Sequence, residues 1–457
     1  MNFLKIPWLE LQLLLPLVGA VVAGSFSSAV RASRWTLGFM IVGMFISLGG
    51  LAANVIVQEP GRLVLGQFRL DGLVLPMLPV LSVLHFLSHL GTSKSRMTSQ
   101  HCVAGLVSMG LTSAAVSCQS PWLFVGILYG MILLPLWDLK AQAQPIRGFV
   151  VYMIPVLALL ALGWWSYDPL SRIWSMGFLG LALTIFGGIA PFHGWLPGLF
   201  QRASLGTAML LVLPMVEVVG VLRFLIPQAP EWVLKVASVG CLVTAVYSAG
   251  MGIIQSDPRR FLAFLVLSQT SLVMFAVMMQ SATSITAALC LWISVSISLA
   301  GLGFSIRALE DRFGRLSLRE HHGHYDQVPG LAIGFLMAGL ASVGFPGTIG
   351  FVPMELLVSS SAQQGLEFSI PLAFTSVLNG IAILRAYFAL FTGKRPVTSV
   401  SLRMTLSERW GIVLIALLIF GAGWFSPSIV ESRHRIAEQL LIGVGGRAAP
   451  AAELPIP

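Results

Sequence analysis

The chain is poor in charge and in residue clusters that hold cofactors. Lys, Arg, Asp and Glu make up 10% of its 457 residues. They make up about a quarter of a water-soluble domain, so a soluble globule is excluded. No CxxC or Cys/His spacing suits zinc, an iron–sulfur cluster or a haem, and we expect no cofactor and no metal on this chain. The isolated cysteines are interpreted as small buried hydrophobic residues; they are Cys102, Cys118, Cys241 and Cys290.

Basic residues are not gathered into a patch either. The formal net charge is +9, but Lys and Arg stand singly between apolar segments, so no nucleic-acid partner is expected. The one histidine cluster, His321, His322 and His324, lies in a polar segment at 307–329 that we expect to form a cytoplasmic loop with a short surface helix. With Asp326 as its nearby carboxylate, the cluster is interpreted as part of a solvated loop, and a metal site is the alternative.

What the chain does have is long apolar segments. Its residues are 56% hydrophobic, and runs of about 20 apolar residues without two-residue alternation predict membrane-spanning helices rather than a barrel. The sequence therefore predicts an all-α polytopic membrane protein of about 14 transmembrane helices, in a single transmembrane domain over 1–457. We expect the first run, 11–22, to be a retained span rather than a signal peptide. The predicted spans are 9–29, 35–57, 72–91, 102–119, 121–139, 147–166, 171–192, 205–226, 231–253, 260–279, 283–306, 330–352, 368–391 and 409–430.

Lys and Arg alternate in number along the loops between these spans. Loops that follow odd-numbered spans carry 17 of the 27, and the opposite side, with both ends of the chain, carries 8. Cytoplasmic loops carry the excess, so both termini are predicted on the non-cytoplasmic side of a bacterial-type inner membrane. Arg223 and Arg385 fall within spans. Before the tenth span, Asp257 is expected to cap the helix and Arg259 to lie at the surface.

Two segments carry the glycines and prolines of broken helices. They are 186–199 (FGGIAPFHGWLPGL) and 343–356 (VGFPGTIGFVPMEL). Irregular backbone at membrane depth is tolerated only where protein or a water-filled cavity satisfies its polar groups, so both segments indicate a transport path. The residues expected to break the helices are Gly187, Gly188 and Pro191 in the first segment and Gly344, Pro346, Gly347, Gly350 and Pro353 in the second.

Four ionisable residues at or near membrane depth are candidates for an ion path. Glu217 is interpreted either as a proton-carrying or gating carboxylate or as a structural partner of Arg223 or another helix. Glu355 either joins a relay or faces a partner subunit. His193 is either a hydrogen-bonding residue of the helix break or a relay member. Arg385 either neutralises a carboxylate or extends its side chain to the cytoplasmic edge.

Several stretches, in order, resemble a known family. They are QFRLDGL at 67–73, PFHGWLP at 191–197, QSDPRRFLAF at 255–264, GFPGTIGFV at 344–352 and NGIAILRAYF at 379–388. They resemble the antiporter-like membrane subunits shared by respiratory complex I, membrane-bound hydrogenases, Mrp cation antiporters and two-component inorganic-carbon uptake systems. The resemblance covers residues from about 60 to about 390.

The resemblance implies a fold of fourteen helices with two inverted five-helix repeats, spans four to eight and nine to thirteen, each with one broken helix. The segments that follow from it are 1–101 for spans one to three, 102–226 for the first repeat, 231–391 for the second repeat with the loop 307–329, and 409–457 for the last span and tail. It also implies a line of lysines, glutamates and a histidine along the middle of the membrane. Most of these positions hold other residues in this chain: Phe186, Tyr129 or Gly130, Met215 or Glu217, a position near Val295, and Met354 followed by Glu355.

These observations favour an antiporter-like membrane subunit of a multi-subunit, ion-gradient-coupled complex. Its expected partners are the lipid bilayer, protons or monovalent cations, and further antiporter-like subunits or a large cytoplasmic protein. Inorganic-carbon uptake or a redox module would lie on those partners, since no catalytic site is expected here. The alternative is a non-conducting scaffold that has lost most of the relay and anchors partner chains. A third hypothesis is a membrane enzyme acting on lipid or isoprenoid substrates, with the cluster around His321 as its site.

Overall fold

The computed structural model describes residues 6–57, 63–64, 66–92, 97–165, 172–393 and 403–443, and nearly all of them are helical. Lys5, Arg62, Lys94, Arg96, Lys394, Arg395 and Arg447, which entered the loop count, lie outside the described residues, as does most of the tail. The helices are α1 Trp8–Ser25, α2 Ala29–Val57, α3 Met77–Leu90, α4 Ser99–Ser117, α5 Pro121–Ala141, α6 Arg147–Trp165, α7 Arg172–Phe186, α8 Trp195–Arg202, α9 Leu205–Val212, α10 Val216–Gly220, α11 Glu231–Ile254, α12 Pro258–Met278, α13 Ala282–Phe313, α14 Pro329–Ser342, α15 Phe351–Gln364, α16 Leu366–Phe391, α17 Leu406–Trp424 and α18 Ser426–Gly443. Two short strands, β1 Leu63–Val64 and β2 Phe68–Arg69, pair antiparallel.

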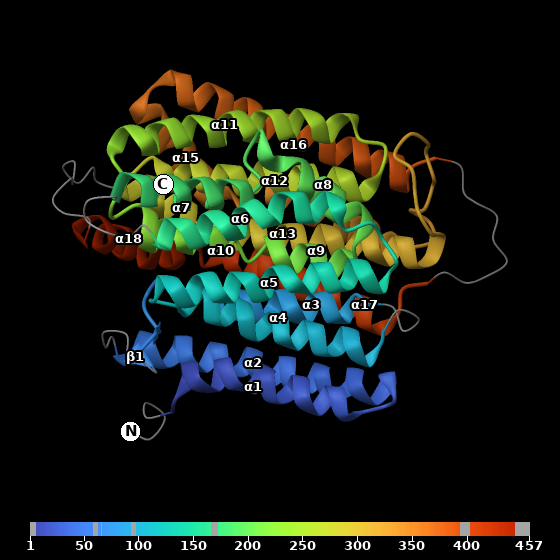
Figure 1. Ribbon diagram of the computed structural model, residues 1–457. Helices are drawn as coiled ribbons and strands as arrows, with labels where there is room; N and C mark the ends of the chain where they lie inside the picture. Colours follow the sequence, from blue (N-terminus) through green and yellow to red (C-terminus); the bar gives the residue numbers. More distant parts are fainter. Residues whose placement is uncertain are drawn as a thin grey trace.

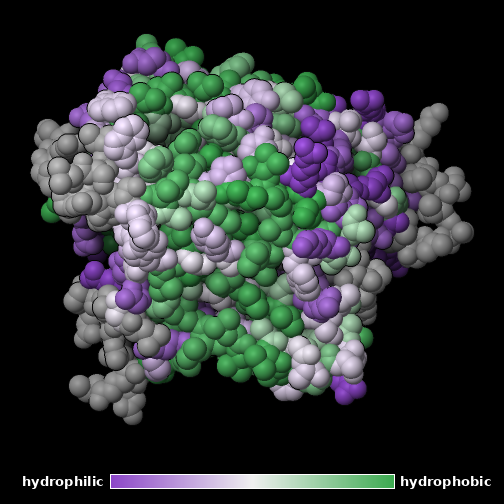
Figure 2. Space-filling view, in the orientation of Figure 1, coloured by the Kyte–Doolittle hydropathy of each residue, from purple (hydrophilic) through white to green (hydrophobic). Residues whose placement is uncertain are grey.

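The helices lie side by side in one bundle (Figure 1). Nine of those described, together with the segment Leu205–Leu225 that contains α9 and α10, are long and apolar enough to cross a membrane, and α3, α14 and most of α7 are shorter apolar helices. The surface shows a broad apolar band with polar residues gathered toward the ends of the helices (Figure 2). The predicted all-α polytopic membrane fold is therefore confirmed. The count of fourteen spans, the two inverted repeats and the segment boundaries stay predictions.

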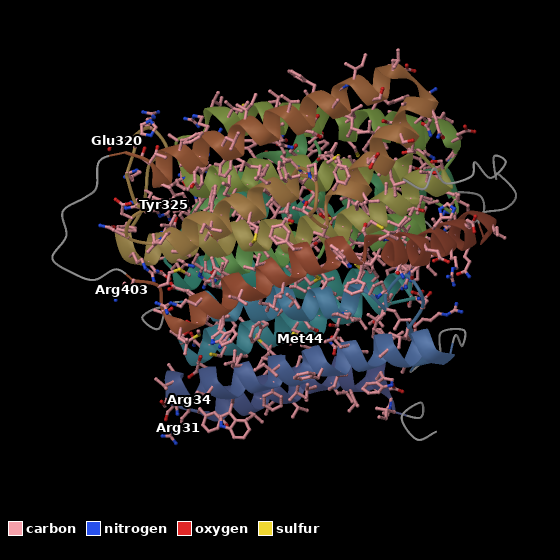
Figure 3. The ribbon with its side chains drawn as sticks, turned by 180° about the vertical axis from the view of Figure 1, so that it is seen from behind. Arg31, Arg34, Met44, Glu320, Tyr325 and Arg403 are labelled. Atoms are coloured by element: carbon pink, nitrogen blue, oxygen red, sulfur yellow. The ribbon has the colours of Figure 1, made fainter. Side chains whose placement is uncertain are left out.

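Several labelled charged residues lie at one end of the bundle. They are Arg31, Arg34, Glu320 and Arg403, whereas Met44 lies midway along α2 (Figure 3). We call this the basic end. The end where β1 and α18 lie is called the far end (Figure 1).

The centre of the bundle is formed by α12 and α13. Their most apolar 18-residue windows are entirely buried, whereas those of α1 and α2 are 39% and 33% buried. A helix that is apolar all round belongs in an interior, and one with a single buried side faces lipid here. The remaining helices therefore surround a two-helix core.

Both predicted broken helices are interrupted where their glycines and prolines fall. After α7 ends at Phe186, Gly188 has φ +71° and a short 3₁₀ turn, Phe192–Gly194, leads into α8. After α14, Gly344 and Gly347 have φ +81° and +84°, values that favour glycine. Gly350 is required for a different reason, because a Cβ there would lie 2.2 Å from the carbonyl oxygen of Ala341. The remaining break residues, Gly187, Pro191, Pro346 and Pro353, lie within or next to these turns.

A third interruption lies in the span 205–226, which was drawn as continuous. α9 ends at Val212, Met215 has a left-handed φ of +45°, and α10 begins at Val216, followed by a π turn at Val221–Leu225. Pro214 has no N–H to continue the helix. Two side chains of α13 donate hydrogen bonds to the carbonyls freed at this interruption.

Candidate functional site

Glu217 lies at the meeting point of two helix interruptions. It is the second residue of α10, directly after the third interruption, and is 2% exposed. Its Cγ lies 3.7 Å from the position a Cβ would take on Gly187, so it faces the first break. Among the described residues, no Lys, Arg or His forms an ion pair with it.

The alternative in which Glu217 pairs with Arg223 is wrong. The Arg223 Nη2 lies 2.8 Å from the Asp71 carboxylate, and Nη1 donates to the Cys118 carbonyl at 2.5 Å. Asp71 precedes Arg223 by 152 residues, so sequence proximity gave no hint of this pair. Glu217 therefore has no cation from its own helix.

Neighbouring helices hold the backbone of the third interruption in place. Trp292 Nε1 donates to the Pro214 carbonyl at 3.0 Å, and Ser296 Oγ donates to the Leu213 carbonyl at 2.8 Å. Both donors belong to α13, at the centre of the bundle. Carbonyls freed inside a membrane protein need such partners, so α13 fixes the turn from which Glu217 projects.

The first break is satisfied in the same way. The Ala190 N–H donates to Thr244 Oγ1 at 3.0 Å, and Trp195 Nε1 donates to the Ile185 carbonyl at 3.0 Å. His193 packs edge-on against Tyr247, with ring centroids 5.0 Å apart. Its Nδ1 is buried with no hydrogen-bond partner. The structure thus places His193 in the break itself.

Glu355 does not point inward. It is exposed on α15, while the preceding Met354 is 7% exposed and packs in the core. The second break is exposed on this side too, at Phe345, Pro346 and Gly347. The structure therefore brings Glu355 and the second break to the outer surface and does not bring Glu355 to Glu217.

Arg385 donates a hydrogen bond at the C-terminal end of another helix. Its Nη1 donates to the Gln255 carbonyl at 3.0 Å, at the C-terminus of α11. A cation at a helix C-terminus is favourable because the last carbonyls are unpaired. No carboxylate of the described chain pairs with it.

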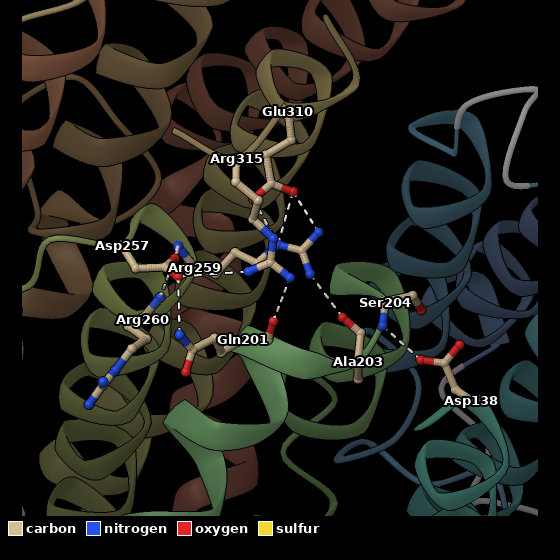
Figure 4. Close-up of polar contacts among 9 residues, drawn as sticks. All are labelled: Asp138, Gln201, Ala203, Ser204, Asp257, Arg259, Arg260, Glu310 and Arg315. Carbon is tan, nitrogen blue, oxygen red and sulfur yellow. Dashed lines mark hydrogen bonds and ion pairs between the residues drawn. The ribbon is translucent and has the colours of Figure 1, made fainter. Parts of the chain in front are cut away.

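A buried ion pair at the basic end was not predicted. Arg259 Nε and Nη2 donate to the Glu310 carboxylate at 2.5–2.9 Å, and Nη1 donates to the Ala203 carbonyl at 2.9 Å (Figure 4). The pair is 4% and 3% exposed, so the expected surface position of Arg259 is wrong. Asp257 does cap α12, accepting from the Arg259 N–H at 2.8 Å.

The segment 307–329 differs from its prediction. α13 continues to Phe313 in place of the expected short surface helix. The following loop docks on the end of α16, where the N–H groups of His322 and Tyr325 donate to backbone carbonyls. His324 is 4% exposed and stacks on Phe313 at 3.6 Å, so this side chain is buried. Glu320, His321 and Tyr325 are exposed, as expected of a solvated loop. His321 and His322 use ring nitrogens on backbone carbonyls, at 3.2 and 2.7 Å.

Three further histidines were missed. His85 and His89 lie on α3 and His101 on α4, and they line one cavity together with Ser108 and Thr207. The four-residue spacing of His85 and His89 in an apolar run was the available signal, since it places both on one helical face.

Comparison with known proteins shows similarity to transmembrane subunits of NADH:quinone oxidoreductases and Mrp antiporters. Residues 156–379 match the family described as NADH:quinone oxidoreductase/Mrp antiporter, transmembrane. NADH-quinone oxidoreductase subunit M of Escherichia coli (strain K12) is 26% identical over 311 residues, which cover 62% of this chain and 60% of that protein. NADH-quinone oxidoreductase subunit 13 of Thermus thermophilus is 25% identical over 482 residues, which cover 96% and 99%. The chain thus spans 60% of the length of the Escherichia coli relative it matches.

Solved structures share the fold over nearly the whole chain. One is a chain of respiratory complex I from Thermus thermophilus with bound NADH, with a TM-score of 0.84, 20% identity, and coverage of 96% of this chain and 100% of that chain. Another is a chain of the Mrp complex from Dietzia sp. DQ12-45-1b, with a TM-score of 0.83, 16% identity and the same coverage. The matched residues 156–379 include both predicted breaks, Glu217 and Glu355.

Proposed function

We propose that this chain, which is similar to the NADH:quinone oxidoreductase and Mrp antiporter family over residues 156–379, is an antiporter-like membrane subunit that contributes a proton or monovalent-cation path to a multi-subunit, ion-gradient-coupled complex. Its relatives named above are oxidoreductase subunits, so a redox module on partner chains is proposed over inorganic-carbon uptake. The complex lies in a bacterial-type inner membrane. Both termini face the non-cytoplasmic side, and the basic end is the cytoplasmic one.

The observation that carries the proposal is the position of Glu217. A carboxylate buried in a membrane protein with no cation beside it is stable only as the neutral acid or with a bound cation. Two interruptions meet at this residue, and interrupted helices are where transporters bind ions. Glu217 is therefore the proposed site at which the transported proton or cation is held.

Partner subunits are supported by the exposed second break. Irregular backbone and a carboxylate facing lipid are both costly, yet Gly347 and Glu355 are exposed on one side of the bundle, roughly midway between the start of α14 and the end of α15. Exposed Phe345 and Phe351, at 51% and 37%, add apolar area. We propose that another membrane subunit covers this face.

The path is tested with Glu217→Gln in the complete complex. We expect proton or cation flux in sealed vesicles to fall by about tenfold or more, since the amide cannot bind and release a proton. Glu367→Gln, at an exposed carboxylate in the first turn of α16, is the matched control and should leave flux unchanged. Wild-type flux in Glu217→Gln would contradict the proposal.

A non-conducting scaffold is the second candidate, and a specific observation favours it. The positions that hold the relay in the family are occupied here by buried apolar side chains, including Phe186 at 4%, Val295 at 1% and Met354 at 7% exposed. Unchanged flux in Glu217→Gln, with loss of partner subunits from the purified complex in Glu355→Gln, would favour this candidate.

A further inference from the structure

Away from Glu217, a line of buried polar side chains follows the contact between α3 and α4. We call it the α3–α4 seam. Its members on α3 are three and four residues apart, which places them on one side of that helix, and those on α4 are seven, four, one and four residues apart, so that His101, Ser108 and Thr112 share one side. Apart from His101, none is more than 8% exposed. The seam consists of Ser82, His85 and His89 on α3, His101, Ser108, Thr112, Ser113 and Ser117 on α4, and Gln12 of α1.

His85 is the central group, and its hydrogen bonds define how it can exchange a proton. Nδ1 lies 2.8 Å from the Leu81 carbonyl oxygen, which can only accept, so Nδ1 carries a proton. Nε2 lies 3.1 Å from Ser108 Oγ, which donates to it in the neutral ring. The imidazole is fully buried. A proton can therefore enter and leave this ring only through Nε2.

At the basic end, the seam reaches the cavity that the three histidines line. His89 Nε2 lies 3.1 Å from Ser33 Oγ. The Thr92 hydroxyl donates a hydrogen bond to the Ser88 carbonyl at 2.9 Å. His101 Nε2, which lies 3.4 Å from Thr92 Oγ1, must therefore be the donor in that contact. Arg307 Nη2 also donates to Thr92.

The charged and titratable groups around the cavity are all basic or neutral. His89 and His101 line it with His85. Arg307 of α13 lies next to it, because its Nη1 donates to the carbonyl of Ser88, a residue that lines the cavity. No described Asp or Glu lines it. A mobile proton on His85 therefore has no carboxylate to hold it permanently.

Toward the far end of the seam, two buried polar atoms have no hydrogen-bond partner in the described part of the chain. Ser113 Oγ and Gln12 Oε1 are both unpaired, although the residues are 0% and 1% exposed. The Gln12 amide nitrogen donates to Ser82 Oγ at 3.1 Å. Buried polar atoms that have no hydrogen-bond partner in the protein normally bind an ordered water molecule. Successive seam residues four positions apart lie about 6 Å apart along a helix, a gap that one water bridges.

The seam ends at a charged group near the far end. Ser117 is followed by Cys118, whose carbonyl accepts from Arg223, and Arg223 pairs with Asp71. The Asp71 side chain is 27% exposed. Polar groups thus extend along the whole length of α4, from His101 to the Asp71 carboxylate.

We infer that the α3–α4 seam is a second proton path in which His85 binds the proton. It lies apart from Glu217 but is coupled to it through α13, which contacts both sites, so that a block at either site stops turnover of the complex. A proton reaches Nε2 from the cavity and forms the imidazolium, while Nδ1–H stays bonded to Leu81. It leaves from the same Nε2 to water on the Thr112 side, and the neutral ring is restored. The inference rests on the proposed function in one respect, that a proton gradient acts across the complex.

The decisive variant is Ser113→Ala. Removing an unpaired buried hydroxyl breaks no hydrogen bond within the protein. If the seam is only structural, the variant should therefore keep the stability and the proton flux of the wild type. The proton path predicts that flux falls by about tenfold, because a water loses its anchor. The complete complex in liposomes is energised by a potassium diffusion potential and read with an internal pH dye. His85→Gln is expected to give the same loss.

Matched threonines supply the control. Thr112 and Thr375 are both fully buried and both donate to the carbonyl four residues earlier, at 2.9 and 2.8 Å, but only Thr112 belongs to the seam. Thr112→Val should lower flux and Thr375→Val should not. Wild-type flux in folded Ser113→Ala and Thr112→Val would overturn the inference.

Two further results separate this path from the one at Glu217. If Glu217→Gln stops flux and the seam variants do not, the inference falls and the proposed function stands; the opposite pattern supports the seam alone. Independently, ¹⁵N spectra of histidine-labelled protein, assigned with His85→Gln, should show neutral His85 protonated at Nδ1. A proton on Nε2 of neutral His85 would overturn the inference.

Discussion

The buried pair of Arg259 and Glu310 allows a quantitative prediction. Replacing Arg259 by Met leaves Glu310 buried at 3% exposure without its cation and frees the Ala203 carbonyl. Breaking one side of a buried pair costs about 3–5 kcal/mol, so we expect Arg259→Met to lower the free energy of unfolding by about that amount. The exposed pair Arg435–Glu431, at 63% and 68% exposure, is the control. Arg435→Met should cost about 0–1 kcal/mol.

The measurement is unfolding in mixed micelles, followed by tryptophan fluorescence, with the double variant Arg259→Met/Glu310→Leu included. Removing both charges avoids the isolated carboxylate, so the double variant should regain most of the loss. Because Arg259 also holds the end of α8, the single variant should loosen the segment that follows the first break. An Arg259→Met protein as stable as the Arg435→Met protein would refute the assignment of a buried, mutually dependent pair.

Three further predictions follow from close contacts. Gly350→Ala should destabilise the protein by about 1–3 kcal/mol because the added Cβ meets backbone at 2.2 Å, whereas Gly380→Ala, which meets nothing within 4 Å, should be neutral or stabilising in a thermal melt. Ser296→Ala should cost about 1–3 kcal/mol by unpairing the Leu213 carbonyl, and an unchanged melt would contradict that bond. Burial, with a smaller contribution from His322, lowers the pKa of His324 from 6.5 to about 4; the unfolded loop then binds more protons between these values, so docking should weaken as pH falls from about 6.5 to 4. Hydrogen exchange of the loop after α13 should show this, and His324→Phe should remove the pH dependence.

The breaks were predictable and the third interruption was not, for a physical reason. Gly188, Gly344 and Gly347 stand in clusters of glycine and proline that no continuous helix would carry. Pro214 stands alone in an apolar run, and prolines within α1, α5, α6 and α16 leave those helices continuous. Whether a single proline interrupts a helix depends on the donors opposite it, here two side chains of α13.

Polar partners were the least predictable part of the site. Arg223 was one of the alternative partners considered for Glu217, but it pairs with Asp71, which is 152 residues away in the sequence. The extent of the loop at 307–329 was overestimated because Arg307 and Glu310 look like loop residues and are buried by long-range contacts. The direction of Glu355 depends on a rotation of one helical position that spacing alone does not fix.

The central helix α13 has a consequence for energy transfer between the two proposed conduits. Trp292 and Ser296 hold the turn that carries Glu217, and Arg307, about three turns further along, holds Ser88 and Thr92 beside the histidine cavity. The helix α13 is buried from Ser284 to Glu310, and a helix so closely packed cannot slide or rotate at one site and stay still at the other. A shift of α13 driven by a partner subunit would therefore change ion occupancy at Glu217 and at the histidine cavity at the same time.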